Sequence, residues 1–129
     1  MNKRILIIDD EVSIRETLAG VLEDEGFSSI ATSSAEEGLD LLESTNIDLV
    51  LLDIWLGDSM DGMTALEKIR ERYTMPVIMI SGHGTIETAV QATRKHAFDF
   101  SEKPLSYDKI ILAITNALGM HARAAARFV

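Results

Sequence analysis

The sequence Leu49-Val50-Leu51-Leu52-Asp53 is an aliphatic run that ends in a carboxylate. Two other runs have the same character, Ile5-Leu6-Ile7-Ile8 and Val77-Ile78-Met79-Ile80. Continuous aliphatic runs, without the alternation of a half-exposed sheet, are typical of parallel strands that helices cover on both faces. The three runs therefore predict the centre of such a sheet.

Around these runs the sequence predicts five strands, each followed by a helix. The expected strands are residues 4–8, 29–32, 48–52, 77–80 and 97–100. Apolar residues recur at helical spacing between them, as in Ile14, Leu18 and Leu22, a helix that Gly26 would end. Ser34 followed by Glu37 has the spacing of a capping box at the start of the second helix.

The alternation of strands and helices indicates an α/β fold. Right-handed crossovers turn five such units into a doubly wound parallel sheet with five flanking helices. The flavodoxin-like strand order 2-1-3-4-5 is the common solution, and it puts the first and third strands side by side. We expect that order here.

Composition and charge set the class of protein. The chain has 129 residues, 47% of them hydrophobic, which suits one domain. Twelve Lys and Arg against 21 Asp and Glu give a formal charge of −9, so direct contact with nucleic acid or anionic lipid is not expected. Cysteine is absent, which excludes disulfides and thiolate chemistry. Neither a secretory signal nor an apolar run near the ~20 residues of a membrane span is found, and we expect a cytoplasmic protein.

Polar residues gather where the expected strands end, which is where doubly wound folds bind ligands. The first strand leads into Asp9 and Asp10, the third into Asp53, the fourth into Ser81, and the fifth runs on to Lys103. Three converging carboxylates cannot all stay ionised without a compensating cation. Hard oxygen ligands favour Mg²⁺, and a lysine suits a phosphate oxygen.

These side chains together predict a phosphoryl-accepting centre. Phosphoryl transfer needs little beyond in-line positioning and neutralisation of charge, which a carboxylate, a divalent ion, a lysine and a hydroxyl supply. Asp53 is the expected nucleophile because it stands alone on the central strand, whereas Asp9 and Asp10 are paired as metal ligands.

Five motifs in order resemble the receiver domain of two-component response regulators. They are Leu6-Ile7-Ile8-Asp9-Asp10-Glu11, Leu51-Leu52-Asp53, Asp61-Gly62, Ile80-Ser81-Gly82 and Glu102-Lys103-Pro104. The resemblance covers residues 3–118 and implies a CheY-like receiver domain over residues 1–119. Residues 81–90 and 98–105 are most similar to the nitrogen-regulation type, in which an ATPase and a DNA-binding domain follow. Residues 120–129 would then be a linker or the start of a truncated C-terminal region, unless the chain is a stand-alone receiver.

The resemblance implies roles for the residues around Asp53. Asp53 would accept a phosphoryl group from the histidine of a sensor kinase. Asp10 would bind Mg²⁺ directly and Asp9 directly or through water, with the backbone carbonyl of Trp55 as a further ligand. The remaining contacts, to the phosphoryl oxygens, would come from Ser81 and Lys103.

The resemblance also implies a conformational switch. Phe100 occupies the position of an aromatic residue that turns inward when Ser81 moves toward the phosphate, a shift between two packed states; plain core packing of Phe100 is the alternative. The bulk of Trp55 and His83 beside the phosphate would slow hydrolysis, unless both are loop residues without kinetic effect. The bond before Pro104 is a candidate cis peptide.

This chain departs from the family pattern at two places. The loop over residues 54–62 is one residue longer than usual and lacks the proline that customarily follows the position of Leu56, so we expect a looser loop. His96 replaces a glycine at the end of the fourth helix, where a positive φ is expected.

The sequence thus predicts a signalling switch rather than a metabolic enzyme. Its own chemistry would be self-directed phosphoryl transfer and slow autodephosphorylation, and its output a changed surface around the fourth helix, fifth strand and fifth helix, which a homodimer could use. One alternative is a small Mg²⁺-dependent phosphatase, but the Asp-x-Asp spacing and a substrate cap are missing. The other is a binding module, either a receiver that acts without phosphorylation or a flavin carrier, whose phosphate the residues Asp9, Asp10 and Glu11 would repel.

Overall fold

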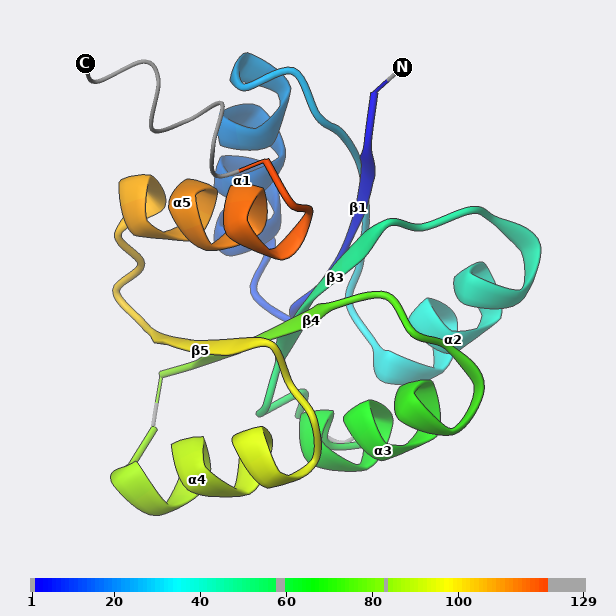
Figure 1. The fold of residues 1–129 in the computed structure, drawn as a ribbon, viewed down its shortest axis with the longest axis vertical. Helices are drawn as coiled ribbons and strands as arrows, with labels where there is room; N and C mark the ends of the chain where they lie inside the picture. The colour runs from blue at the N-terminus through cyan, green and yellow to red at the C-terminus, as the bar shows by residue number, and fades with distance from the viewer. Residues whose placement is uncertain (1, 58–59, 83, 121–129) are drawn as a thin grey trace.

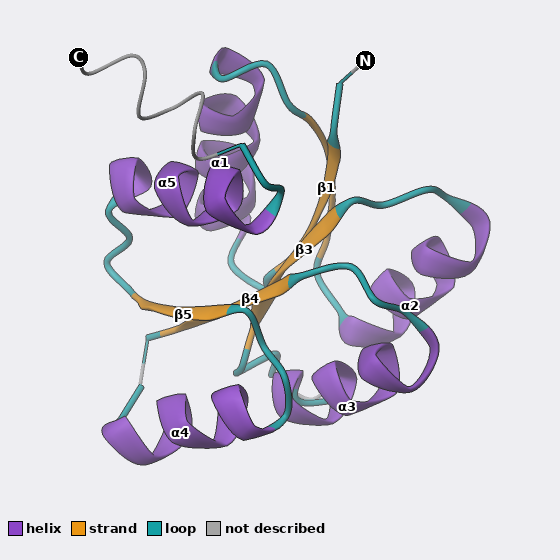
Figure 2. Cartoon of the chain, in the orientation of Figure 1, coloured by secondary structure: helices purple, strands orange, loops and turns teal. Residues whose placement is uncertain are grey.

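Five parallel strands form one sheet in the computed structural model, which describes residues 2–57, 60–82 and 84–120 (Figures 1 and 2). The strands are β1 (Arg4–Ile8), β2 (Ser28–Thr32), β3 (Leu49–Asp53), β4 (Val77–Ser81) and β5 (Asp99–Glu102). The helices are α1 (Val12–Asp24), α2 (Ala35–Ser44), α3 (Gly62–Arg72), α4 (Ile86–Arg94) and α5 (Tyr107–Ala117). The spatial order β2-β1-β3-β4-β5 confirms the predicted topology.

Helices cover both faces of the sheet. Helices α1 and α5 lie on one face, and α2, α3 and α4 lie on the other (Figure 1). Side chains of the central strands alternate between two cores, so that Leu6 and Leu52 pack with α2 and α3, whereas Ile7 and Leu51 pack with α1 and α5. Because both faces are covered, β3 and β4 are buried along their whole length, which explains their unbroken aliphatic sequences.

The fifth strand lies two residues later than predicted. Residues 97–100 were expected to form it, but β5 spans Asp99–Glu102. The amide of Ala97 is used to close α4, where it donates to the Ala92 carbonyl at 2.9 Å, and His96 has the expected positive φ of 68°. The strand therefore starts only after this turn. The other strand boundaries agree with the prediction to within one residue.

The expected capping residue of α2 is in place, with a different partner for its glutamate. Ser34 Oγ accepts from the Glu37 amide at 3.2 Å. The Glu37 carboxylate does not reach back to the Ser34 amide, which donates to Thr32 Oγ1 at 3.4 Å; it accepts instead from the hydroxyls of Thr32 and Ser34. Half of the capping box thus forms.

The end of the described chain follows α5 closely. The helix ends at Ala117, Gly119 has a φ of 74°, and the Met120 amide donates to the Thr115 carbonyl at 2.7 Å. The predicted linker or C-terminal region over residues 120–129 lies, apart from Met120, outside the described residues. No helix within the described ranges combines the length and apolar character of a membrane span.

Two helical glycines are expected to respond to alanine with opposite signs. A Cβ on Gly38 of α2 would overlap Cδ1 of the fully buried Ile8 and lie 2.9 Å from its Cγ1, whereas a Cβ on Gly20 of α1 would meet nothing within 4 Å. Gly38→Ala should therefore lower the free energy of unfolding by about 1–3 kcal/mol through overpacking. Gly20→Ala should raise it by about 0.5–1 kcal/mol through helix propensity. Urea denaturation measures both, and equal stabilisation by the two variants would contradict the close approach of α2 to β1.

Candidate functional site

The sheet topology brings two buried carboxylates together. Ile8 pairs with Leu52 in the β1–β3 ladder, so the residues that follow them, Asp9 and Asp53, lie at adjoining strand ends. Asp9 is fully buried and Asp53 is 2% exposed. One carboxylate oxygen from each of these residues and one from the exposed Asp10 lie within 4.8 Å of one another. The three predicted acidic residues therefore form one cluster at the carboxyl edge of the sheet.

Lys103 supplies the positive charge of this cluster. Its Nζ donates to Glu11 Oε1 at 2.8 Å and to Asp53 Oδ2 at 3.3 Å, and it lies 3.0 Å from Asp9 Oδ2. The backbone holds the lysine in place because the Lys103 amide donates to the Ser81 carbonyl at 2.8 Å. The Lys103–Pro104 peptide bond is cis, the isomer that the resemblance implied.

Burial and like charge shift the protonation of the cluster. Burial raises the pKa of Asp53 to about 6, and the neighbouring Asp9 charge acts in the same direction, while Lys103 opposes both. Burial also raises the pKa of Asp9. Burial by itself would lower the pKa of Lys103, but its pairing with Glu11, Asp9 and Asp53 raises the value above that of a free lysine. The acidic side chains exceed the cations around them, so a further cation is favoured.

The cluster also fits a divalent metal, and Asp9 Oδ2 is one candidate ligand atom. Asp9 Oδ2 is buried, and the Lys103 ammonium lies 3.0 Å from it in a contact of poor hydrogen-bond geometry. The same ammonium also serves Glu11 and Asp53, so this buried oxygen is only partly neutralised. With oxygens of Asp10 and Asp53 nearby, the donor set is the one that Mg²⁺ prefers, and the exposed Asp10 leaves room for the waters that Mg²⁺ retains.

The loop after β3 is anchored at both of its ends. Gly62 donates to the Ile54 carbonyl at 2.8 Å, and a Cβ on it would overlap the Asp53 carbonyl oxygen and lie 2.6 Å from Ile54 Cα. The residue before it, Asp61, caps α3 by accepting from the Thr64 amide at 2.9 Å. The start of α3 is therefore fixed directly against Asp53.

The middle of the same loop touches the site and α2. Trp55 donates its amide to Asp53 Oδ1 at 3.3 Å, and its side chain is 60% exposed. The Met60 amide donates to a carboxylate oxygen of Glu36 in the first turn of α2, at 3.2 Å. Residues 58 and 59 lie outside the described residues. The role of the Trp55 carbonyl as a metal ligand stays a prediction.

The expected switch residues lie beside the cluster. Ser81 is fully buried at the end of β4. Phe100 on β5 is half-buried, and its ring lies against Gly84, where a Cβ would come within 2.6 Å of the ring Cζ. The segment that follows Ser81 is therefore in contact with the aromatic ring. His83, the other predicted modulator of hydrolysis, lies outside the described residues.

Sequence reasoning missed the part that Glu11 plays in this site. Its carboxylate is the nearest partner of Lys103, although the two residues are 92 positions apart in the chain. The only signal in the sequence was that Glu11 extends the Asp9-Asp10 pair, and nothing local connects it with Lys103. Arg15 was missed as well, and its Nη1 donates to the Asp9 carbonyl at 2.7 Å.

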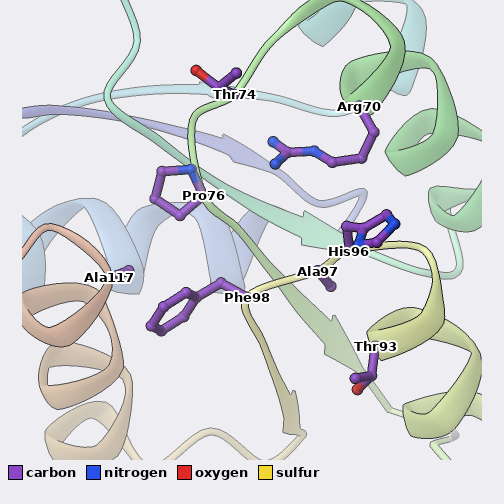
Figure 3. A pocket seen from close by; sticks show the side chains of 8 residues that line it. All are labelled: Arg70, Thr74, Pro76, Thr93, His96, Ala97, Phe98 and Ala117. Atoms are coloured by element: carbon purple, nitrogen blue, oxygen red, sulfur yellow. The ribbon is translucent and has the colours of Figure 1, made fainter.

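A separate hollow of about 510 Å³ opens at the amino ends of β4 and β5 (Figure 3). Its lining includes Pro76 and Phe98, which precede β4 and β5, together with Arg70 and His96. Among the described residues, no carboxylate lines it. Because it lies at the amino ends of the strands, this hollow is distinct from the acidic cluster at their carboxyl ends.

Comparison with known proteins agrees with this geometry. Residues 5–115 match the family model described as response regulator receiver domain. An NtrX-like response regulator of Rickettsia conorii is 48% identical over 115 residues, which are 88% of this chain and 24% of that protein. The nitrogen assimilation regulatory protein NtrX of Azorhizobium caulinodans is 46% identical over 116 residues, 88% of this chain and 26% of that protein. The chain thus spans about a quarter of these relatives.

Solved structures agree as well. The crystal structure of the receiver domain of NtrX from Brucella abortus is similar with a TM-score of 0.85 and 46% identity, covering 89% of this chain and 98% of that one. A CheY-like receiver domain protein from Methanospirillum hungatei gives a TM-score of 0.86 at 32% identity, covering 96% of this chain and 99% of that one. The fold is therefore the CheY-like receiver fold.

The raised pKa of Asp53 predicts a pH-dependent cost of folding. Its value of about 6 lies above the ordinary 3.8, so the folded state binds more protons between these pH values and stability falls as pH rises through them. In EDTA, Asp53→Asn should raise the free energy of unfolding at pH 7.5 by at most about 3 kcal/mol, and the gain should vanish near pH 4. Urea denaturation at several pH values measures this, and an Asn variant less stable than the wild type at pH 7.5 would contradict it.

Proposed function

The chain belongs to the response regulator receiver domain family, and from this membership we propose that it is a switch in which Asp53 accepts a phosphoryl group from the histidine of a sensor kinase. The observation that carries the proposal is the position of Asp53, buried at the end of β3 with Lys103 Nζ at 3.3 Å from its Oδ2 and the carboxylates of Asp9 and Asp10 beside it. These are the parts that phosphoryl transfer to a carboxylate requires.

In the proposed reaction a carboxylate oxygen of Asp53 attacks the phosphorus atom in line with the bond to the kinase histidine. The new O–P bond forms as the P–N bond breaks, and the histidine leaves with the electron pair of that bond. With a pKa of about 6, most Asp53 side chains are ionised and nucleophilic at neutral pH. Mg²⁺, held by Asp9, Asp10, Asp53 and the Trp55 carbonyl, would neutralise charge on the phosphoryl oxygens.

Lys103 and Ser81 would then hold the phosphoryl group. The ammonium already lies at Asp53 Oδ2, so a short movement of its flexible stem exchanges a carboxylate for a phosphoryl oxygen. The Ser81 hydroxyl would donate to a second oxygen. Because the segment after Ser81 touches the Phe100 ring through Gly84, movement of Ser81 would change the packing of this ring and so shift the population of two states.

The surface that responds would be the face of α4, β5 and α5. Exposed apolar side chains occur here, with Val90 and Ile86 on α4 and Leu112 on α5. Exposed apolar side chains on both helices could be buried in a protein contact, and a second copy of the chain is the partner we propose. With a formal charge of −9, the domain itself would make no direct contact with nucleic acid, and its effect on transcription would pass through domains that follow it in longer relatives.

The remaining assignments follow from this function. Residues 1–119 would form the receiver, and residues 120–129 a linker or the start of a further C-terminal region. The domain would work in the cytoplasm beside its kinase, without a membrane contact of its own, and would catalyse only its own phosphorylation and slow dephosphorylation. The exposed Trp55 indole beside the site would limit the access of hydrolytic water.

The first test is phosphorylation by a small acyl phosphate in the presence of Mg²⁺, followed by intact mass. The wild type should gain one phosphoryl group, and EDTA or Asp53→Asn should abolish the gain. Asp40→Asn, which changes an exposed aspartate on α2, is the matched control and should behave as the wild type. No gain by the folded wild type would contradict the mechanism and favour a receiver that binds partners without phosphorylation. Turnover of a free phosphomonoester would instead favour the phosphatase.

The proposed dimer face has its own test. Val90 is 42% exposed on α4, and Val90→Glu would bury a charge in the proposed contact. Sedimentation velocity of the phosphorylated protein should show a dimer for the wild type and a monomer for this variant, with unchanged phosphoryl uptake. Thr17→Glu places the same charge on an exposed site of α1 and should leave the dimer intact. A dimer that persists in Val90→Glu would exclude this face.

A further inference from the structure

Lys103 has three carboxylate partners that are not equivalent. Asp9 and Asp53 are buried and belong to the group of oxygens that fits a metal ion. Glu11 is the nearest partner, with its Oε1 at 2.8 Å from Nζ, and it does not belong to that group. Its side chain is 55% exposed, so its charge costs little to keep. Lys103 is thus paired with two carboxylates that a metal would require, Asp9 and Asp53, and with one that it would not, Glu11.

The position of Glu11 is fixed by the start of α1. It is the N-cap residue of this helix, and its amide donates to Asp9 Oδ1 at 2.9 Å. N-cap side chains commonly accept from the first amides of their helix, yet Glu11 makes no such hydrogen bond. Its carboxylate points instead to Lys103, which comes from the far end of β5. The backbone contact to Asp9 therefore holds this second carboxylate beside the metal-binding one.

We propose that Glu11 is a positioning residue that takes over Lys103 when Mg²⁺ occupies the cluster. A metal that binds Asp9 through its Oδ2 would compete with the ammonium, which lies 3.0 Å from that oxygen, and would weaken this ion pair through repulsion between the two cations. Glu11 offers the displaced ammonium a partner that already lies at hydrogen-bond distance. The lysine then remains next to Asp53 for the phosphoryl group instead of opposing the metal. This inference rests on the proposed metal-dependent function.

The proposal is tested by binding of Mg²⁺ alone, without any phosphate donor. Trp55 is the single tryptophan, and its backbone contacts Asp53, so its fluorescence reports on the site, with calorimetry as a second readout. Glu11→Gln should weaken Mg²⁺ binding by about tenfold, which is the lower end of the effect of residues that position metal ligands. Glu11→Asp keeps the charge but is one methylene shorter, and it should weaken binding to a similar extent. Glu16→Gln removes an equal charge from an exposed site of α1 and should bind as the wild type.

A double-mutant cycle separates positioning from simple charge. In a Lys103→Met background there is no ammonium to take over, so Glu11→Asp should have no further effect on Mg²⁺ affinity. Full binding by Glu11→Asp with weak binding by Glu11→Gln would overturn the proposal in favour of charge alone. Wild-type affinity in both Glu11 variants would overturn it as well, while leaving the phosphoryl-acceptor function intact. Absence of Mg²⁺ binding by the wild type would overturn both.

Discussion

Two carboxylates lie side by side at buried strand ends with one lysine between them, and the rest of the site depends on this constraint. Asp9 and Asp53 are almost without solvent exposure, and their mutual repulsion adds to the cost of burial. The cost of burying this pair must be offset by the stability of the strands that end in these carboxylates. Strands β1 and β3 meet this requirement because each packs its side chains into both cores. The stability of a parallel sheet covered on both faces thus permits an acidic cluster at the carboxyl ends of its central strands.

The same burial of like charges makes the acidic cluster sensitive to an added cation. Lys103 is within ion-pair distance of three acidic side chains, so its single positive charge cannot neutralise all of them. A cluster that is incompletely neutralised gains from any added cation, and the gain is largest where water is excluded. A rigid and fully compensated site would offer no such gain. An incompletely neutralised cluster therefore suits a switch better than a fully compensated, purely structural ion pair would.

The sequence determined most of this picture through patterns that are local. The aliphatic runs located β1, β3 and β4, and the carboxylates that follow them were predicted to converge once the strand order was assumed. The fifth strand was placed two residues too early because Ala97 and Phe98 are apolar like strand residues, while the turn that closes α4 uses the Ala97 amide. The pairing of Glu11 with Lys103 could not be predicted, since its geometry depends on where β5 ends relative to α1.

Strand β5, at the side of the sheet, can couple a change of charge at the cluster to a conformational change. The central strands β3 and β4 are buried throughout, whereas β5 has four residues of half-buried or exposed character and pairs with β4 alone. Elements with little buried apolar area open at the lowest free-energy cost. Phe100 on this strand touches Gly84 in the loop after Ser81, and Lys103 follows directly from the strand end. The residues that would sense a phosphoryl group are thus connected to a sparsely buried strand at the side of the sheet, while the buried centre keeps the acidic cluster in place.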